Sequence, residues 1–336
     1  MSIVMTGGGT GGHLAIIKAV KEQLKDEELI YIGSTKGQDK QWFENDDDFK
    51  EKYFFDTRGV VNQKGVGKLK SLWMMIQAAR QARKLLKKHQ VKVVFSVGGF
   101  SSAATAFAAK STGIPLVIHE QNAALGSLNK LLKPYAKAFI SSYLEESSIK
   151  AYPIKEVFFE NARVRGGVKA VIFLGGSQGA KAINALALSL APELKKREIK
   201  IIHQAGVNNI DEIEKAYRDL GIEAEVFGFT TKLADYMNEA DFAIARAGAS
   251  TLWELSATAL PTLFIPYPYA ASDHQFYNAQ FLVEKDLAWL MREDIIDEEK
   301  VLSILNENME VKSKGLMEIV EKDGSKKIAI LLKNMI

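Results

Sequence analysis

Apolar and polar positions alternate along the chain in blocks that repeat one unit of structure. Short apolar runs typical of buried strands are followed by segments whose apolar residues have helical spacing. Strands that alternate with helices predict a parallel sheet with helices on both faces. In the first half of the chain, strands are expected at residues 3–6, 29–32, 91–97 and 115–119, and helices at residues 13–25 and 69–88.

The pattern starts again after residue 154. A strand, a glycine turn and a helix follow one another at residues 170–190, as they do at the start of the chain. We therefore predict an α/β protein of two Rossmann-like, doubly wound parallel sheets that face each other across a cleft. The first domain is residues 1–154, the second is residues 155–320, and a C-terminal helix of about residues 321–336 could return to the first. Further strands are expected at residues 200–203, 225–227, 242–245 and 261–265.

Composition narrows the class of protein. The chain has 336 residues, 47% of them hydrophobic and 25% charged, which is usual for a globular protein of about two domains. The absence of cysteine excludes disulfides, thiolate catalysis and metal sites with cysteine ligands. The first residues do not resemble a secretory signal, and no apolar run approaches the roughly 18 residues that span a bilayer. We therefore expect a cytoplasmic protein that does not cross a membrane.

Positive charge is concentrated in one part of a chain whose net charge is only +3. Residues 57–119 contain eleven Lys and Arg residues and no Asp or Glu, which indicates an anionic partner. Within them, residues 69–88 combine bulky apolar side chains with a basic end. This composition is typical of a helix on an anionic membrane, although a core helix with a solvated basic face has it too. Nucleic acid is not expected as a partner, because no nucleic-acid-binding motif is present.

The first glycine turn, Gly7-x-Gly9-x-x-Gly12, matches the dinucleotide-binding pattern between a strand and a helix. A dinucleotide site also needs an acid at the end of the second strand, and residues 31–34 contain none. The turn therefore favours another ligand with oxygens or negative charge, which the helix N-terminus can bind. His13 follows directly and could act as a general base, because histidine titrates near neutral pH. A histidine that only caps or packs is the alternative.

The second glycine turn, Gly175-Gly-Ser177-Gln-Gly179, allows two interpretations. As an anion-binding turn it places N–H groups and the Ser177 hydroxyl near a phosphate. As Gly-x-Ser-x-Gly it matches the nucleophile elbow of α/β-hydrolases, with His203 and His274 available later in the chain. The elbow belongs to one large sheet, whereas this turn opens a second half-chain, so phosphate binding is favoured.

A third segment of small residues follows the strand at residues 242–245 and begins with Arg246. Ser250 and Thr251 suit a helix N-terminus that caps itself and binds a diphosphate. Glu254 could accept both hydroxyls of a ribose, although an acid in the first turn of a helix is also favoured by the helix dipole.

Asp46 and Asp48 could be mistaken for a pair of metal-binding carboxylates. They lie in a polar run away from any strong strand, so we expect a solvated loop. No cluster of His, Asp and Glu has convincing metal spacing, and neither a metal nor a cofactor is expected.

Five segments, taken in order, resemble a known family. They are residues 5–13, 98–102, 119–122, 175–180 and 246–254. The set is similar to the MurG family of peptidoglycan enzymes, which transfer N-acetylglucosamine to lipid I and make lipid II. The resemblance implies a GT-B fold, with the acceptor and the membrane on the N-terminal domain and UDP-N-acetylglucosamine on the C-terminal domain. It also implies an inverting, metal-independent transfer to the muramyl C4 hydroxyl. The enzyme is then expected to be a peripheral protein at the cytoplasmic face of the cell (inner) membrane.

The resemblance also implies a set of site residues. His13 is the leading candidate for the base that takes the acceptor proton, and Glu120 is a weaker one. For the donor sugar and diphosphate, the resemblance implies contacts from Thr10, Gly11 and Gly12, from Asn122 and Gln275 at the sugar, and from Ser177 at the diphosphate. For the nucleotide, it implies contacts from Thr230 at uracil and from Arg246, Ala249, Ser250, Thr251, Leu252 and Glu254, with Glu254 on the ribose.

The sequence departs from the family pattern at three places. Phe100 stands where the family usually has tyrosine, so no phenol can act there. Lys155 stands where the family has an arginine. Whether Lys155, Arg163 or neither takes over the role of that arginine is left open by the sequence. The loop at residues 267–273 is one residue longer, which loosens the assignment of Gln275. Another UDP-sugar transferase of the same fold, a nucleotide-sugar sensor without catalysis, and a serine hydrolase remain as alternatives.

Overall fold

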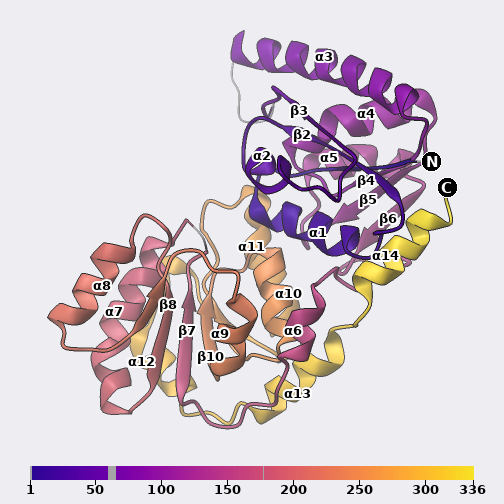
Figure 1. The fold of residues 1–336 in the computed structure, drawn as a ribbon. Helices are drawn as coiled ribbons and strands as arrows, with labels where there is room; N and C mark the ends of the chain where they lie inside the picture. Colours follow the sequence, from indigo (N-terminus) through magenta and orange to yellow (C-terminus); the bar gives the residue numbers. More distant parts are fainter. Residues whose placement is uncertain (1, 60–65, 177) are drawn as a thin grey trace. The chain divides into compact units, whose positions relative to one another are not determined.

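The computed structural model describes residues 2–59, 66–176 and 178–336 (Figure 1). The chain divides into two compact units. The first comprises Met1–Ile154 together with Asp323–Ile336, and the second comprises Lys155–Lys322. Each unit is built around its own six-stranded sheet, in which every pair of neighbouring strands is parallel.

The sheet of the first unit has the strand order β3-β2-β1-β4-β5-β6. Its strands are β1 (Ser2–Thr6), β2 (Glu28–Ser34), β3 (Glu51–Phe55), β4 (Val91–Ser96), β5 (Leu116–Glu120) and β6 (Ala138–Ser141). Its helices are α1 (Gly11–Lys21), α2 (Asp39–Phe43), α3 (Val66–Lys88), α4 (Ala103–Thr112), α5 (Ser127–Leu132) and α14 (Gly324–Lys333), with the 3-10 turns η1 (Phe100–Ser102) and η2 (Lys133–Tyr135).

The sheet of the second unit has the order β12-β11-β10-β7-β8-β9. Its strands are β7 (Ala170–Leu174), β8 (Lys200–Gln204), β9 (Glu225–Phe227), β10 (Phe242–Ala245), β11 (Thr262–Phe264) and β12 (Trp289–Leu290). Its helices are α6 (Glu156–Glu160), α7 (Lys181–Lys196), α8 (Ile210–Asp219), α9 (Leu233–Glu239), α10 (Ala249–Ala257), α11 (His274–Val283), α12 (Glu298–Ile304) and α13 (Glu310–Ile319), with the turns η3 (Ala271–Asp273) and η4 (Glu293–Ile295).

Both sheets have the same doubly wound topology. In each, the chain adds three strands outward in one direction and then returns to add three on the other side. The direction reverses between β1 and β4 in the first unit and between β7 and β10 in the second. Ligands of such sheets bind at this switch point, beyond the carboxyl ends of the strands. The predicted fold class of two Rossmann-like sheets is confirmed.

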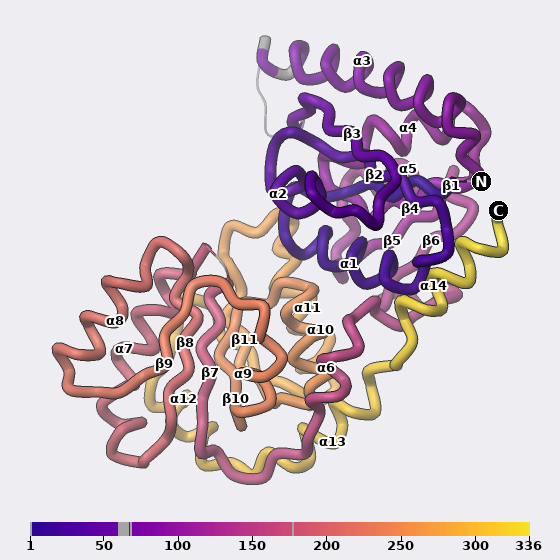
Figure 2. Tube along the Cα trace, in the orientation of Figure 1, coloured from indigo at the N-terminus to yellow at the C-terminus, as the bar shows by residue number. Residues whose placement is uncertain are grey.

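Helices cover both faces of these sheets, so the central strands are almost continuously apolar. All five residues of β1 and all five of β7 are buried. In the first unit, α3 packs along α4, and α14 returns from the end of the chain to lie beside α1 (Figure 2). Because α1 begins directly after the first glycine turn, its position is fixed by both the sheet and the C-terminal helix.

Several elements differ from the expectations. β3, β6 and β12 were not predicted, because β3 is a half-buried edge strand, β6 has only four residues and β12 has two. The loop with Asp46 and Asp48 is not simply solvated. Both carboxylates bind the ammonium of Lys21, at 2.7 and 2.5 Å, and Lys21 is only 4% exposed. A buried lysine needs such partners, which explains the acidic run. Among the helices of the described segments, none has the length and apolar content to cross a bilayer.

Candidate active site

Two glycine loops of the first unit lie against each other at the carboxyl ends of β1 and β4. Gly9, Gly98 and Gly99 have φ angles of 88°, 82° and 79°, in the left-handed region that favours glycine. A Cβ on Gly99 would lie 2.5 Å from the carbonyl oxygen of Gly8, and one on Gly9 would lie 2.6 Å from the ring of Phe100. Both the backbone angles and the available space therefore require glycine in these loops.

Asp39 holds the first glycine loop in place. Its buried carboxylate accepts hydrogen bonds from the N–H of Gly9 (2.6 Å), the N–H of Ser34 (3.0 Å) and the hydroxyl of Tyr31 (3.1 Å). The same hydroxyl lies 2.9 Å from the carbonyl oxygen of Gly7, and burial raises the pKa of Tyr31 well above its usual value. An acid therefore does follow the second strand, but its oxygens bind the protein itself and not a ribose.

His13 lies in the first turn of α1, where side chains from two loops contact its ring. The hydroxyl of Thr10 is 3.0 Å from Nδ1, and the side-chain nitrogen of Gln121 is 3.0 Å from Nε2. Thr10 is exposed, whereas Gly11, Gly12 and His13 are half-buried. The imidazole thus connects the loop after β1 with the loop after β5. To act as a base, it would exchange one of these contacts for the substrate hydroxyl.

Glu120 ends β5 and organises the loop that follows it. Its carboxylate accepts hydrogen bonds from the N–H of Asn122 (3.0 Å), the N–H of Gly126 (2.9 Å) and the amide of Asn129 (2.9 Å). The residue is buried, and its donors come from the loop after β5 and from Asn129 in α5. This geometry favours a structural role for Glu120 and gives the half-buried Asn122 a fixed position.

The second glycine turn follows β7 and leads into α7. Gly176 and Gly179 have φ angles of 80° and 79°, and the N–H of Gly179 donates to the carbonyl of Gly176 (2.9 Å). A Cβ on Gly175 would lie 2.7 Å from the nitrogen of Ala180, so the turn is tightly folded. Ser177 lies outside the described residues. A tight glycine turn before a helix N-terminus is the arrangement that binds phosphate in many proteins.

The third segment forms the N-terminal half of α10. The helix begins at Ala249 with Gly248 as N-cap, so Ser250 and Thr251 lie inside its first turn and do not cap it. Glu254 therefore lies in the second turn, not the first. The first N–H groups of a helix have no partner within the helix and can bind an anion. Ala249 and Leu252 are buried, and Ser250, Thr251 and Glu254 are half-buried.

Arg246 connects the loop before α10 with neighbouring segments. Its guanidinium donates to the carbonyls of Ile265 (3.0 Å) and Pro266 (3.1 Å) and forms an ion pair with Glu293 at 2.5 Å. It also lies over the ring of Tyr267, 5.5 Å from the ring centre. Arg246 therefore fixes the ends of β10 and β11, which carry the other predicted residues.

Gln275 and Thr230 lie on two further loops at the carboxyl edge of the same sheet. The side-chain oxygen of Gln275 accepts from the N–H of Tyr267 (2.9 Å), which directs its amide nitrogen as the donor for a ligand. The hydroxyl of Thr230 accepts from the N–H of Lys232 (3.0 Å). The preceding Phe229 is 63% exposed. The structure thus brings residues from four loops of the second unit to one edge of its sheet.

Glu254 has the most informative ionisation in the second unit. Although part of its side chain reaches solvent, burial of the carboxyl raises its pKa to about 8, and the positive charge of Lys155 opposes this shift. Lys155 is the N-cap of α6, which packs against α10. Strong pKa perturbation at a concave edge of a sheet is typical of functional sites.

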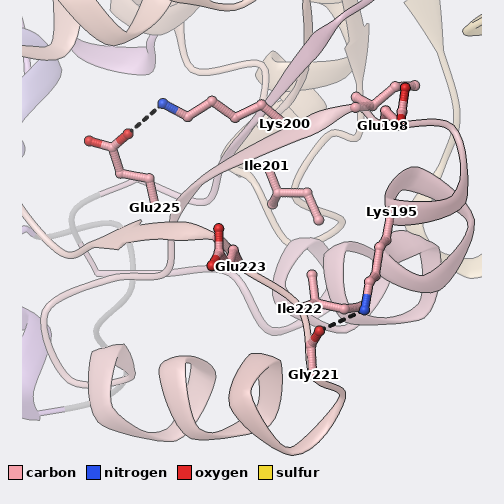
Figure 3. A pocket seen from close by; sticks show the side chains of 10 residues that line it. Lys195, Glu198, Lys200, Ile201, Gly221, Ile222, Glu223 and Glu225 are labelled. Carbon is pink, nitrogen blue, oxygen red and sulfur yellow. Dashed lines mark hydrogen bonds and ion pairs between the residues drawn. The ribbon is translucent and has the colours of Figure 1, made fainter.

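A surface pocket of the second unit does not coincide with any of these residues (Figure 3). It lies at the amino ends of β8 and β9, where Lys200 pairs with Glu225 at 2.9 Å and Lys195 donates to the carbonyl of Gly221. This is the edge of the sheet opposite to the glycine turn. The pocket is therefore not part of the candidate site.

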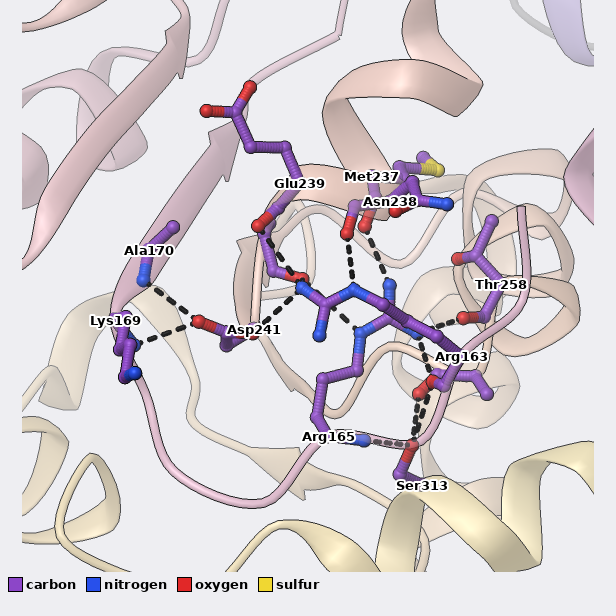
Figure 4. A network of polar contacts seen from close by, with 12 residues as sticks. Arg163, Arg165, Lys169, Ala170, Met237, Asn238, Glu239, Asp241, Thr258 and Ser313 are labelled. Carbon is purple, nitrogen blue, oxygen red and sulfur yellow. Dashed lines mark hydrogen bonds and ion pairs between the residues drawn. The ribbon is translucent and has the colours of Figure 1, made fainter.

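Arg163 and Arg165 form a separate polar network in the second unit (Figure 4). Arg163 donates to the carbonyls of Asn238 and Ala240 at 2.7 and 3.0 Å and pairs with Asp241 at 2.7 Å. Arg165 is buried beside it, also donates to Ala240, and burial lowers its pKa to about 9. Both side chains bind the C-terminal end of α9, so Arg163 does not replace the family arginine. Lys155 lies near Glu254 of α10.

Within the described segments, no three His, Asp or Glu side chains lie close enough together to hold a metal ion. The chemistry available at the two sheet edges is therefore hydrogen bonding, helix N-termini and titratable side chains. The first unit offers an imidazole beside a glycine loop. The second offers two helix N-termini, a carboxyl of raised pKa and an amide.

Comparison with protein families identifies the class of enzyme. The glycosyltransferase family 28 N-terminal domain matches residues 3–141, and the glycosyltransferase family 28 C-terminal domain matches residues 170–331. The chain belongs to glycosyltransferase family 28. It is therefore an enzyme that transfers a sugar, and the interpretation of the Gly175 turn as a hydrolase elbow gains no support from these matches.

Individual relatives of this family-28 enzyme cover its whole length. A protein of Sulfurovum sp. (strain NBC37-1) is 82% identical over 99% of both chains, and one of Campylobacter jejuni (serotype O:6) is 50% identical over 97% of this chain and 95% of its own. Both are named UDP-N-acetylglucosamine–N-acetylmuramyl-(pentapeptide) pyrophosphoryl-undecaprenol N-acetylglucosamine transferase. The crystal structure of Acinetobacter baumannii MurG matches with a TM-score of 0.80 at 26% identity over 99% of both chains. The resemblance to the MurG family is confirmed.

Sequence reasoning about this family-28 enzyme missed three residues that shape the site. Asp39 lies five residues beyond β2, outside the position where a ribose-binding acid was sought. Gln121 was noted only as part of a motif, yet it contacts the ring of His13. Arg292 pairs with Asp273 beside Gln275, at 2.7 Å. A polar residue directly after a buried strand is the signal that could have indicated Gln121, whereas the other two contacts depend on tertiary structure.

The raised pKa of Glu254 predicts a pH dependence of stability in this family-28 enzyme. In the folded state the carboxyl stays protonated up to about pH 8, whereas in the unfolded chain it ionises above the ordinary glutamate pKa of 4.5. The stability that this group contributes is therefore full below pH 4.5 and is lost as the pH rises through 8. Glu254→Gln, which cannot ionise, should gain stability over the wild type between pH 5 and 8, on the order of a few kcal/mol at the upper end.

This prediction is checked by urea unfolding of both proteins at half-unit intervals from pH 5 to 9. Parallel curves, with a constant difference in the free energy of unfolding, would show that the carboxyl ionises normally in the fold.

Proposed function

We propose that this chain transfers N-acetylglucosamine from UDP-N-acetylglucosamine to the muramyl C4 hydroxyl of lipid I, with inversion, and so makes lipid II for peptidoglycan synthesis. The observation that carries the proposal is the 82% identity, over 99% of both chains, to a relative named for this transfer. The two sheets support it, because one edge offers an imidazole and the other offers the groups that a nucleotide-sugar needs.

The second unit is proposed to bind the donor. The N–H group of Gly176, with the hydroxyl of Ser177, and the N–H groups of the first turn of α10 hold the diphosphate without a metal. The carboxyl of Glu254 accepts hydrogen bonds from the ribose hydroxyls. Thr230 contacts uracil through its backbone. The nucleotide site is shaped by Arg246, Ala249, Ser250, Thr251 and Leu252, and Lys155 adds positive charge beside it. Gln275 is the contact of this unit with the donor sugar, and Asn122 is proposed as the contact from the first unit.

His13 is proposed as the base. In an inverting transfer, the acceptor oxygen attacks the anomeric carbon while a base takes its proton, and UDP leaves from the opposite face. The ring of His13 is already oriented by Thr10 and Gln121. Glu120 uses its carboxylate to hold its own loop, so it is the weaker candidate. Gly11 and Gly12 give the substrate close access to the backbone at the start of α1.

The first unit is proposed to rest on an anionic membrane through α3. Its basic end is exposed at Arg80, Arg83 and Lys84. A continuous apolar stripe is also exposed, with relative accessibilities of 69% at Leu69, 48% at Leu72, 60% at Trp73 and 45% at Ile76. These four residues recur at helical spacing and so lie on one face, while the opposite face packs on α4. An interfacial helix has this combination, which supports the proposal of a peripheral enzyme at the cytoplasmic face of the membrane.

The transfer is tested by incubating the protein with UDP-N-acetylglucosamine and a lipid I analogue. We expect release of UDP together with a β-linked disaccharide product, in equal amounts and without added metal. Binding of the donor without either product would identify a sensor. Transfer to a different acceptor only would identify another transferase of the same fold.

Replacement of the proposed base should reduce turnover strongly. His13→Ala removes the group that takes the acceptor proton, and we expect kcat to fall by roughly 10²- to 10⁴-fold with little change in UDP affinity. Steady-state kinetics and calorimetry with UDP measure the two quantities. Thr112→Ala, at the C-terminal end of α4 and so at the end away from the glycine loops, controls for general loss of stability. Near-normal turnover by folded His13→Ala would assign the base elsewhere.

Membrane binding should depend on the charge of α3. Reversal of Arg80, Arg83 and Lys84 to Glu removes three cations, each worth about 1 kcal/mol near an anionic surface, so vesicle affinity should fall by about 100-fold or more in total. Co-sedimentation with vesicles that contain anionic lipid measures it, across a series of salt concentrations. Reversal of Lys196, Lys215 and Arg218, which are exposed on the second unit, is the matched control. Equal loss in both triple variants would remove α3 from this role.

A further inference from the structure

The segment after β12 contacts two donor loops through two consecutive residues of opposite charge. Glu293 pairs with Arg246 at 2.5 Å, at the start of the nucleotide segment. Arg292 pairs with Asp273 at 2.7 Å, two residues before Gln275. Neither Arg292 nor Glu293 belongs to the motifs that identify the family. Through these contacts, the segment after β12 can influence the conformation of the loop before Gln275.

That loop contains an unusual backbone conformation. Ser272 and Asp273 have φ angles of 54° and 52°, and their ψ angles of 27° and 30° place both in the left-handed helical region. Residues other than glycine adopt this conformation singly and at a cost, so two in succession must be held by their surroundings. The two residues set the direction in which α11 begins, and Gln275 is the second residue of that helix.

Arg292 supplies a side-chain contact to this turn from another segment, in addition to the hydrogen bond that the N–H of Asp273 donates to the carbonyl of Ala270 (2.9 Å). Its Nη2 lies 2.7 Å from Oδ2 of Asp273, and its guanidinium lies over the ring of Phe276, 4.1 Å from the ring centre. Asp273 and Phe276 flank Gln275 along the chain. A planar guanidinium that pairs with a carboxylate and stacks on an aromatic ring fixes both groups at once, which an ammonium does not do.

On the far side, Gln275 is fixed by the backbone. Its side-chain oxygen accepts from the N–H of Tyr267. This hydrogen bond orients the amide nitrogen only while α11 begins in the observed direction. If the turn at Ser272 and Asp273 relaxed to ordinary angles, the first turn of α11 would rotate and the amide would leave its place.

We infer that Arg292 is a positioning residue for donor-sugar recognition: it holds the left-handed turn at Ser272 and Asp273 and so orients Gln275. The inference rests on the proposed function, because it takes Gln275 as the contact of the donor sugar. A loss of Arg292 should therefore affect binding of the sugar part of the donor and not of its nucleotide part. UDP, which lacks the sugar, does not depend on Arg292, whereas UDP-N-acetylglucosamine does.

The test compares two ligands on one variant. For Arg292→Gln we expect the Kd of UDP-N-acetylglucosamine to rise by about tenfold, as expected when a strained turn loses a supporting contact, while the Kd of UDP changes less than about twofold. Isothermal calorimetry measures both. Arg218→Gln, which loses only a surface pair with Glu214 on α8, is the matched control and should change neither Kd.

A second variant tests the cause. Ser272→Gly places the one residue that adopts left-handed angles without strain at the turn, and it leaves Asp273 in place. In the Arg292→Gln background, it should restore most of the lost affinity for the sugar nucleotide. In the wild-type background, it should have little effect. A general loss of folding would not be rescued in this ligand-specific way.

The outcomes distinguish the inference from the function on which it rests. Wild-type protein that fails to bind or use UDP-N-acetylglucosamine overturns the proposed function. If the wild type is active and Arg292→Gln weakens UDP and the sugar nucleotide equally, or neither, the positioning role is wrong. If the selective loss occurs but Ser272→Gly does not restore affinity, Arg292 does not act through the turn, and the inference is likewise overturned.

Discussion

The close approach of two backbones determines the geometry of the first unit. A Cβ on Gly99 would lie 2.5 Å from the carbonyl oxygen of Gly8. The loops after β1 and β4 can therefore approach each other this closely only because residue 99 is glycine. Meeting there, at the switch point of the sheet, they place the start of α1 and the ring of His13 at the carboxyl edge. Asp39 stabilises the arrangement from beneath, because its buried carboxylate binds the N–H of Gly9 and the end of β2 at the same time.

The same sheet order supports a different kind of site in the second unit. Its glycine turn leads directly into α7, and β10 leads through Gly248 into α10, so two helix N-termini lie beside the switch point. The side chains at this edge differ from those at the corresponding edge of the first unit. Arg246 connects the ends of β10 and β11, and Glu254 carries a carboxyl whose pKa burial raises to about 8. A shared topology thus produces one edge suited to a base and one suited to a nucleotide.

Much of this architecture can be predicted from the sequence, and there are physical reasons why the rest cannot. Buried strands, glycine turns and the restart after residue 154 are local patterns, and they predict both sheets. β12 has only two residues, and β3 is half-buried, so neither leaves a clear pattern. Contacts between distant segments leave none at all. Asp39 binding the N–H of Gly9 and Arg292 binding Asp273 join residues whose partners only the fold can specify. Conversely, Arg163 looked available for substrate in the sequence, and the structure assigns it to the end of α9.

We propose that the donor diphosphate binds the second glycine turn and the start of α10, and that the Gly7–Gly12 turn serves a different part of the reaction. Amide hydrogen exchange of the full chain, with and without saturating UDP, distinguishes these locations. We expect slower exchange in peptides that cover residues 175–181 and 248–254, and unchanged exchange at residues 7–13. Protection at residues 7–13, with none at the two segments of the second unit, would contradict it.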